Sequence, residues 1–426
     1  MTKPRSPAPV EKPAVLTIAG SDSGGGAGIQ ADLKTIEATG GFGTSAVTAA
    51  TAQNTRGVES THVLPVEEIA AQIDAVRSDF DVRAIKTGML ATAEIVERVA
   101  AAAAAAECPV VVDPVMVAAT GDRLLSEAAE STYETLIAEA TLVTPNADEA
   151  AVLTGIEPTG EASARAAGRE LLATGADAAL VKGGHIPGDE VIDVLLSDSG
   201  AETMRHPRID TDATHGSGCT LSAAIATRLA RGQALSTAVE RSTAFMGRAL
   251  RYHHAVGSGP GAVHHLAGIR NEAARNAAID AAYELADALD RTGRTIPDAG
   301  GIVAATPYAE TVDDVATIET DPSAVDGDRR STDDGSAFGR ARFGASGRLA
   351  RTLLEAREAD PGLCVGIERR LDSALEADLE GAGWTVVAPD RDGFDGVSGP
   401  IAVQGGADDR TAFLLAAATG TVIDPL

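Results

Sequence analysis

The sequence predicts an α/β protein whose larger part is a mostly parallel β-sheet with helices on both faces. Short apolar segments alternate with helical segments and are joined by short loops, a pattern typical of such sheets. Polar residues recur where the apolar segments end, at Gln53, Asp113, Asn146 and Lys182. Because ligands of these folds bind beyond the carboxyl ends of the strands, we expect one site there.

The elements follow from apolar runs and from apolar residues at helical spacing. The predicted strands are 15–19, 45–52, 84–88, 109–115, 141–144 and 178–182, with an antiparallel edge pair at 191–196 and 202–206. The predicted helices are 29–39, 69–78, 95–106, 128–139, 148–154, 165–174, 220–230 and 236–253. The order of these elements predicts a first domain over residues 13–262, preceded by a disordered leader at 1–12.

A helix at 271–290 is expected within a helical connector at 263–299, and a smaller α/β domain is expected at 300–426. Its predicted helices are 341–358 and 371–381, and its predicted strands are 386–388 and 401–404. The acidic, small and polar residues of 321–336 predict a mobile loop.

Composition narrows the class of protein. The chain has 426 residues and is 44% hydrophobic, which excludes a disordered acidic chain, but it is only 3% aromatic, so Ala, Val, Leu and Ile must build its core. A net charge of −27 with lysine at only five positions indicates a protein adapted to concentrated salt. This charge argues against nucleic acid and anionic membranes as partners.

The cysteines and the chain start indicate the compartment. Cys108, Cys219 and Cys364 are far apart and form no CxxC pair, so neither a disulfide framework nor a zinc site is expected. The polar, proline-rich start is no signal peptide, and no apolar run is long enough to span a bilayer. We therefore expect a cytoplasmic protein.

The segment 212–222 predicts an anion site. Gly216 and Gly218 allow successive backbone N–H groups to point at one place, and the helix expected from Thr220 aims the positive end of its dipole there. Cys219 lies at the edge of this segment, where a thiol is expected to shift towards thiolate. A helix start rich in small residues around a buried cysteine is the alternative.

Two reactions fit an anion site beside a thiol. Acyl transfer would require a base for Cys219; His215 is close in sequence, but nothing in the sequence fixes its orientation. In phosphoryl transfer, which we favour, the loop would stabilise charge on the phosphoryl group and Cys219 would accept the hydroxyl proton. Lys182 would contact nucleotide phosphates, and Asn146 with Glu149 could hold magnesium through water.

The glycine-rich loop 20–28 fits neither the P-loop nor the dinucleotide pattern, so we expect it to admit a small substrate or simply to form a tight turn.

These motifs carry a resemblance. Seven segments, in order along residues 14–262, resemble the hydroxymethylpyrimidine/phosphomethylpyrimidine kinase family of thiamine biosynthesis, which has a ribokinase-like fold: 19–34, 51–55, 86–90, 112–116, 144–149, 181–185 and 215–220. Relatives with other substrates carry Asp where Cys219 stands, so the cysteine favours the pyrimidine.

The resemblance implies two successive ATP-dependent phosphorylations of 4-amino-5-hydroxymethyl-2-methylpyrimidine at one site. It implies that Gly20, Asp32, Gln53, Met89 and Val115 line the pyrimidine pocket. It implies that Lys182, Asn146 and Thr214 serve ATP, that Asp113 and Glu149 serve Mg²⁺, and that Gly216, Gly218 and Cys219 form a catalytic anion hole. A homo-oligomer, most simply a dimer, is expected because ribokinase-type sheets commonly pair.

The second domain resembles the archaeal-type thiamine-phosphate synthase domain through residues 343–346 and 349–351. The implied reaction joins the pyrimidine diphosphate to a thiazole phosphate and releases pyrophosphate, with Ser346, Arg348 and Arg351 binding phosphate. The family usually has His where this chain has Arg348. A domain that only binds or senses thiamine phosphate is therefore the alternative.

Overall fold

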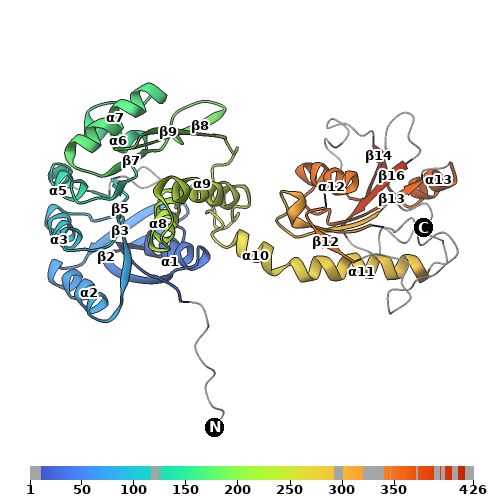
Figure 1. Ribbon diagram of the computed structural model, residues 1–426, viewed down its shortest axis with the longest axis horizontal. Helices are drawn as coiled ribbons and strands as arrows, with labels where there is room; N and C mark the ends of the chain where they lie inside the picture. Colours follow the sequence, from blue (N-terminus) through green and yellow to red (C-terminus); the bar gives the residue numbers. More distant parts are fainter. Residues whose placement is uncertain are drawn as a thin grey trace, which may run out of the picture. The chain divides into compact units, whose positions relative to one another are not determined.

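The computed structural model describes residues 11–116, 124–125, 127–291, 301–319, 340–345, 347–370, 373–387, 394, 399–404 and 411–417. The chain divides into two compact units, Met1–Gly268 and Ile269–Leu426, and each is described by itself (Figure 1). No helix of the described residues is long and apolar enough to cross a membrane.

The N-terminal unit contains a nine-stranded sheet in the order β3-β2-β1-β4-β5-β6-β7-β8-β9. Its strands are β1 (Ala14–Asp22), β2 (Phe42–Asn54), β3 (Gly57–Val63), β4 (Val82–Thr87), β5 (Val110–Val112), β6 (Leu142–Val143), β7 (Ala178–Val181), β8 (Glu190–Ser197) and β9 (Gly200–Pro207). The strands from β2 to β7 pair in parallel, whereas β3 at one edge and β8 and β9 at the other are antiparallel. The predicted mostly parallel sheet and its antiparallel edge pair are thus confirmed. Strand β3 was not predicted because it is largely exposed and polar, so no apolar alternation marks it.

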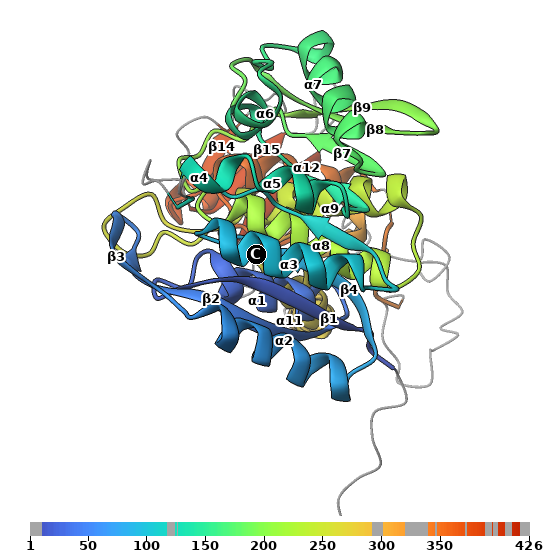
Figure 2. The same ribbon diagram turned by 90° about the vertical axis from the view of Figure 1, so that its left-hand side faces the viewer.

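Helices cover both faces of this sheet (Figure 2). They are α1 (Gly28–Ala38), α2 (Val66–Asp79), α3 (Ala93–Ala104), α4 (Glu127–Glu130), α5 (Tyr133–Ile137), α6 (Ala147–Thr154), α7 (Glu161–Thr174), α8 (Ser217–Ala230) and α9 (Leu235–Arg251). Leu16 and Ile18 of β1 face the core shared with α2, α3, α5 and α7, whereas Val15 faces the core shared with α1, α8 and α9. Because successive strand residues point to opposite faces, a strand buried on both sides must be apolar throughout. The predicted helix 128–139 is instead two short helices, separated by a turn.

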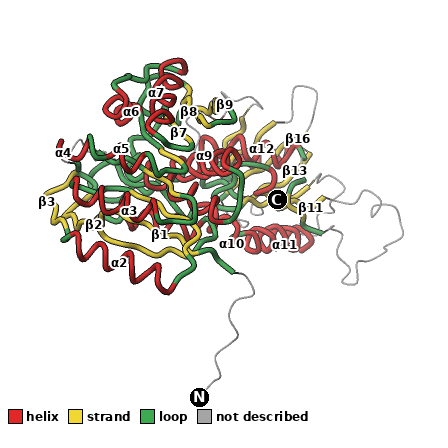
Figure 3. The backbone as a smooth tube through the Cα atoms, turned by 60° about the vertical axis from the view of Figure 1, so that its left-hand side comes forward, coloured by secondary structure: helices red, strands yellow, loops and turns green. Residues whose placement is uncertain are grey.

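The parallel strands bring their carboxyl ends to the same edge of the sheet. Strand β1 ends at Asp22, β2 at Asn54 and β5 one residue before Asp113. Beyond β6 and β7, Asn146 and Lys182 form a further parallel bridge. The polar residues that the sequence places after successive strands therefore lie at one edge of the sheet. Figure 3 shows the strands in yellow and the helices in red.

The C-terminal unit contains a seven-stranded sheet in the order β12-β11-β10-β13-β16-β15-β14. Its strands are β10 (Gly301–Ala305), β11 (Val315–Glu319), β12 (Arg342–Phe343), β13 (Val365–Arg370), β14 (Thr385–Val387), β15 (Ile401–Gln404) and β16 (Thr411–Ala416). A short 3₁₀ helix, η2 (Val312–Asp314), precedes β11, and all pairings are antiparallel except β14 with β15. Helices α11 (Arg275–Arg291) and α13 (Ser373–Gly381) pack on one face, and α12 (Arg348–Ala359) packs on the other.

Helix α11 corrects the predicted connector at 263–299. Its residues Ala278, Ala282 and Leu285 are buried against Ile302 of β10, in the core of the C-terminal unit. The boundary between the units lies after Gly268, near the start of α10 (Ala267–Ala273), because the apolar face of α11 covers the second sheet.

Helix α12 begins at Arg348 rather than 341, because Arg342 and Phe343 pair with β11 as strand β12. Most of the predicted leader (1–10) and the whole predicted acidic loop (321–336) lie outside the described residues.

Candidate active site

The segment predicted to bind an anion forms a tight loop at the N-terminus of α8. Gly216 caps the helix with a φ of 82°, and a Cβ added there would lie 1.9 Å from the carbonyl oxygen of Gly26. Only glycine satisfies both the left-handed backbone and this close approach. The loop and the first turn of α8, residues 216–219, line a pocket and are called the anion cradle below.

A second loop, after β1, packs directly against the anion cradle. The carboxylate of Asp22 accepts hydrogen bonds from the backbone N–H groups of Gly24 (2.7 Å), Gly26 (3.0 Å) and Ala27 (2.8 Å). His215 Nε2 lies 3.0 Å from Asp22 Oδ2. Burial opposes ionisation of Asp22, but the hydrogen bonds from His215 and the backbone outweigh it, so the pKa of Asp22 is lowered. The orientation of His215, which the sequence left open, is therefore fixed by Asp22.

A buried lysine and two carboxylates lie on the other side of the anion cradle. Lys182 Nζ is 3.3 Å from Asp113 Oδ1, and a Cβ added at Gly218 would lie 3.3 Å from the same ammonium group. Burial opposes charging of Lys182, but Asp113 and Glu149 raise its pKa. The arrangement places a fixed positive charge beside the N-terminus of α8.

Glu149 is held by the start of helix α6. Asn146 accepts a hydrogen bond from the Glu149 N–H (2.9 Å), and Glu149 Oε2 accepts one from the Asn146 N–H (2.8 Å), which forms a capping box. Burial raises the pKa of Glu149 to about 7; Asp113 acts in the same direction, and Lys182 opposes it.

The expected thiolate character of Cys219 is wrong. Although the residue retains some exposure, burial of its thiol raises the pKa of Cys219 to about 11, and the negative charges of Asp32 and Asp113 outweigh the help of the Gly28 N–H. Lys86 also favours the thiolate, but it does not reverse the shift. The Lys86 charge and the Gly28 N–H therefore do not compensate for burial, and the thiol stays protonated near neutral pH.

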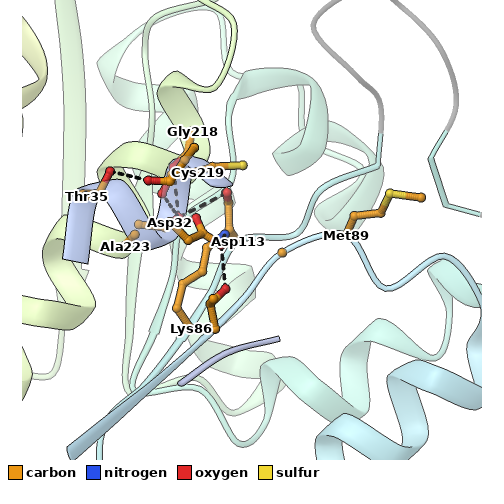
Figure 4. Close-up of polar contacts among 12 residues, drawn as sticks. Asp32, Thr35, Lys86, Met89, Asp113, Gly218, Cys219 and Ala223 are labelled. Carbon is orange, nitrogen blue, oxygen red and sulfur yellow. Dashed lines mark hydrogen bonds and ion pairs between the residues drawn. The ribbon is translucent and has the colours of Figure 1, made fainter. Parts of the chain in front are cut away.

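Asp32 is not where the resemblance places it. Its side chain is fully buried, accepts a hydrogen bond from Thr17 Oγ1 (2.6 Å) and forms an ion pair with Lys86 Nζ (2.9 Å). Burial opposes charging of Lys86, but the negative charges of Asp32, Cys219 and Asp113 together outweigh burial and raise the pKa of Lys86. In Figure 4 the pair lies beneath Cys219, whereas Met89 points away from it. Asp32 therefore lies behind the pocket wall rather than in the wall.

The other predicted residues of the N-terminal unit lie together. They line one pocket of about 430 Å³: Gly20, Gln53, Met89, Asp113, Val115, Asn146, Glu149, Lys182, Thr214, Gly216, Gly218 and Cys219. A second pocket of about 630 Å³ adjoins it and shares Asn146, Lys182, His185, Thr214, Ser217 and Gly218. Its remaining lining comes mainly from β8, β9, α9 and the segment 207–211.

Several pocket residues were not predicted for the binding site, and three of them are polar groups that contact one another or Gln53. Asp22, Thr51 and His215 line the same pocket as the anion cradle. An acidic residue two positions before a run of glycines is a sequence signal for a carboxylate that organises the loop, and Asp22 has this pattern. His215 was considered only as a base for acyl transfer, and no local signal marks Thr51.

The predicted phosphate site of the C-terminal unit is described only in part. Ser346 lies outside the described residues. Arg348 and Arg351 are exposed on the first turn of α12, three residues apart and therefore on one face of the helix, and the Arg348 guanidinium lies 4.9 Å from the centre of the Phe413 ring. Gly347, the N-cap of α12, has a φ of −57°, so the cap geometry of α12 differs from that of the anion cradle, where Gly216 has a φ of 82°.

Comparisons with known proteins agree with this layout. Residues 22–264 match the family model "Phosphomethylpyrimidine kinase", and residues 278–396 match "Thiamine-phosphate synthase ThiN". A hydroxymethylpyrimidine/phosphomethylpyrimidine kinase of Streptomyces coelicolor is 49% identical over 62% of this chain and 98% of its own length. The thiamine biosynthesis bifunctional protein ThiED of Geobacter sulfurreducens is 47% identical over 61% of this chain and 53% of its own.

Solved structures show the same fold for the N-terminal unit. An ADP complex of Bacillus subtilis pyridoxal kinase is 33% identical with a TM-score of 0.56, covering 60% of this chain and 98% of its own. The phosphomethylpyrimidine kinase of Clostridium difficile 630 is 40% identical with a TM-score of 0.51, covering 56% of this chain and 99% of its own. Because the kinase model matches more than half of the chain, the protein belongs to the phosphomethylpyrimidine kinase family, and it carries a C-terminal ThiN thiamine-phosphate synthase domain.

Proposed function

We propose that the N-terminal unit phosphorylates 4-amino-5-hydroxymethyl-2-methylpyrimidine with ATP, first to the monophosphate and then to the diphosphate. The C-terminal domain then condenses the diphosphate with thiazole phosphate to give thiamine phosphate and pyrophosphate. The observation that carries the kinase proposal is the shared pocket, in which the anion cradle and Lys182 face the same space as Gln53 and Met89. An amide and an apolar side chain suit a heteroaromatic ring, and the cradle suits a phosphoryl group.

The adjoining pocket supports ATP as the phosphoryl donor. It begins at Lys182, Asn146 and Thr214 and continues along β8 and β9, so a nucleotide there would direct its phosphates towards the anion cradle. Asp113 and Glu149 are buried carboxylates in the same pocket, a donor set that suits Mg²⁺, which binds few protein carboxylates and otherwise water and phosphate oxygens. When bound, Mg²⁺ would neutralise phosphate charge.

The residues of the chain supply positioning and charge stabilisation. The backbone N–H groups at the start of α8 and the Lys182 ammonium would stabilise negative charge on the transferring phosphoryl group. The raised pKa of Cys219 does not support its predicted role as the base. A loose phosphoryl-transfer transition state needs little help from a base, so the hydroxyl proton could pass to an oxygen of the transferred phosphoryl group, and the protonated thiol would donate a hydrogen bond to the oxygens of that group.

The ThiN family match favours the synthase over the domain that only senses thiamine phosphate. In this proposal Arg348 and Arg351 would bind phosphate or pyrophosphate from the exposed first turn of α12. We further propose that the chain carries both activities in the cytoplasm and forms a dimer. Light scattering would measure the mass of the particle and so test the dimer.

The test uses the purified full chain in concentrated salt with ATP, Mg²⁺ and the hydroxymethyl pyrimidine, with products separated by mass. We expect the monophosphate, then the diphosphate, and thiamine phosphate once thiazole phosphate is added. Absence of any pyrimidine phosphate would refute the kinase. Accumulation of the diphosphate without thiamine phosphate would refute the synthase alone, and an Arg351→Ala variant, which keeps the kinase pocket, serves as the matched comparison.

A further inference from the structure

The amide of Gln53 has two neighbours that determine its orientation. Gln53 Oε1 lies 3.1 Å from Thr51 Oγ1, and Gln53 Nε2 lies 3.4 Å from His215 Nε2. A half-turn about the last side-chain bond exchanges the amide oxygen and nitrogen with almost no change in shape. The hydrogens of the neighbours, rather than their positions, therefore decide which orientation is stable.

His215 offers a hydrogen and not a lone pair. Both oxygens of Asp22 accept hydrogen bonds from backbone N–H groups, and such bonds favour the ionised carboxylate, in agreement with the lowered pKa of Asp22. His215 Nε2, 3.0 Å from Asp22 Oδ2, must therefore carry the hydrogen of that contact. Because that hydrogen is directed to Asp22, the Gln53 NH₂ group would find no lone pair on His215 Nε2, whereas the Gln53 oxygen could share the hydrogen in a three-centre bond.

Thr51 favours the same orientation from the other side. Its hydroxyl has one hydrogen, and the carbonyl oxygen of Ser21 lies 2.9 Å away and can only accept. With that hydrogen donated to Ser21, Thr51 Oγ1 presents a lone pair to Gln53. The Gln53 NH₂ group is the partner for this lone pair, so both neighbours select Oε1 towards His215 and Nε2 towards Thr51.

We propose that His215, held by Asp22, acts with Thr51 as a positioning residue that fixes the Gln53 amide and thereby the direction in which the substrate ring lies. The inference rests on the proposed aminopyrimidine substrate. Its 4-amino group would donate to Gln53 Oε1, and its N3 would accept from Gln53 Nε2. The hydroxymethyl group on C5 is next to C4, so it would lie on the His215 side, and His215 directly precedes Gly216 of the anion cradle.

The opposite amide orientation would select the opposite chemistry. It would pair with the same ring turned over, which carries the hydroxymethyl group away from the anion cradle. If the hydroxymethyl group still faces the anion cradle, the opposite amide orientation would pair with a ring that has an oxo group at C4 and a hydrogen on N3. In that ring position 4 accepts and position 3 donates, the reverse of the 4-amino ring. The 4-oxo analogue, 5-hydroxymethyl-2-methylpyrimidin-4-one, is therefore a probe of the amide orientation.

The experiment measures kcat/KM for phosphorylation of the 4-amino substrate and of the 4-oxo analogue by the full chain. In wild type we expect a preference for the amino substrate of at least about 10-fold, since one mismatched buried hydrogen-bond pair costs roughly that factor or more. In His215→Ala the amide is released, and the preference should fall to within about 3-fold. His215→Gln keeps an N–H donor and should retain most of the preference.

Each outcome is decisive. If His215→Ala slows both substrates equally and leaves their ratio unchanged, His215 is only structural and the inference is wrong. If that variant does not fold, as judged by its unfolding transition, Thr51→Val removes the other neighbour with almost no change in shape, and an unchanged ratio there overturns the inference equally. Phosphorylation of neither pyrimidine by wild type would refute the proposed function and this inference together, whereas an unchanged ratio refutes the inference alone.

Discussion

Replacing Asp32 by Asn tests the assignment of this residue to the buried ion pair rather than to the substrate pocket. The change removes the charge that Lys86 Nζ meets at 2.9 Å but keeps an oxygen that can accept from Thr17. Both side chains of the pair are 0% exposed, so no solvent screens the ammonium group that remains. The free energy of unfolding of the N-terminal unit should therefore fall.

The magnitude follows from burial. Removing one partner of a fully buried ion pair costs about 3 to 5 kcal/mol, because an uncompensated charge is left in the interior. Asp74→Asn is the matched control, since Asp74 pairs with Arg98 at 3.3 Å but is 72% exposed. That exposed pair should contribute less than about 1 kcal/mol. The double variant Asp32→Leu with Lys86→Met should recover most of the loss, because neither charge remains buried.

Hydrogen exchange in denaturant is the appropriate assay, because two units prevent a single two-state treatment of the chain. Amides of β1 and β4 report the N-terminal unit. Trp384, the single tryptophan, is buried in the C-terminal unit, so its fluorescence reports that unit separately. Unchanged protection of β1 together with a 10-fold rise in KM for the pyrimidine would refute the reasoning and return Asp32 to the substrate site.

Four further predictions concern other groups. Cys219→Ala should lower kcat about 10-fold or more with little change in KM for ATP; steady-state kinetics checks this, and an unchanged kcat removes Cys219 from the mechanism. Glu149 has a pKa raised to about 7, so its protonated form is favoured by the fold, and stability should decline as pH rises from about 4.5 through 7. For Glu149→Gln, the free energy of unfolding plotted against pH should be flatter over this range than for wild type. Parallel plots for the two proteins would contradict the raised pKa of Glu149. Ala91 has a φ of 65°, a left-handed backbone that glycine adopts without strain. Ala91→Gly should therefore be neutral or stabilising by about 1 kcal/mol, and Ala91→Val should be destabilising. The reverse order in unfolding experiments would show that the backbone at Ala91 is unstrained. Finally, a net charge of −27 predicts a melting temperature that falls when salt is diluted, and insensitivity to salt would argue against adaptation to brine.

Sequence reasoning located the fold and most of the pocket because both depend on local patterns. Apolar runs such as 178–181 mark buried parallel strands, and polar residues after them must meet at one edge of the sheet. Strands β11 and β13 escaped prediction because their charged residues, such as Arg369 in β13, interrupt the apolar run. Strands β10 and β16 also escaped prediction, although both are largely apolar.

The errors at the site concern groups whose state depends on three-dimensional neighbours. Cys219 has the local features of a reactive thiol, but the carboxylates of Asp32 and Asp113, distant in sequence, help burial keep it protonated. The resemblance places Asp32 in the pocket, yet Lys86, which compensates the charge of Asp32, comes from strand β4, far from helix α1 in the sequence. His215 gains its orientation from Asp22, and no local pattern joins these two residues.

Helix α8 has a consequence for the order of assembly on the ribosome. It packs against β1, β4 and β5, which are all complete before residue 113, whereas α8 begins at Ser217. At roughly 5 to 20 residues per second, the part of that sheet face that α8 covers, beside α1, lacks its helix for on the order of ten seconds. During this interval the loop around Asp22 has no His215 to bind, so binding competence arises only when α8 docks. Chaperone dependence of synthesis should therefore concentrate in this interval.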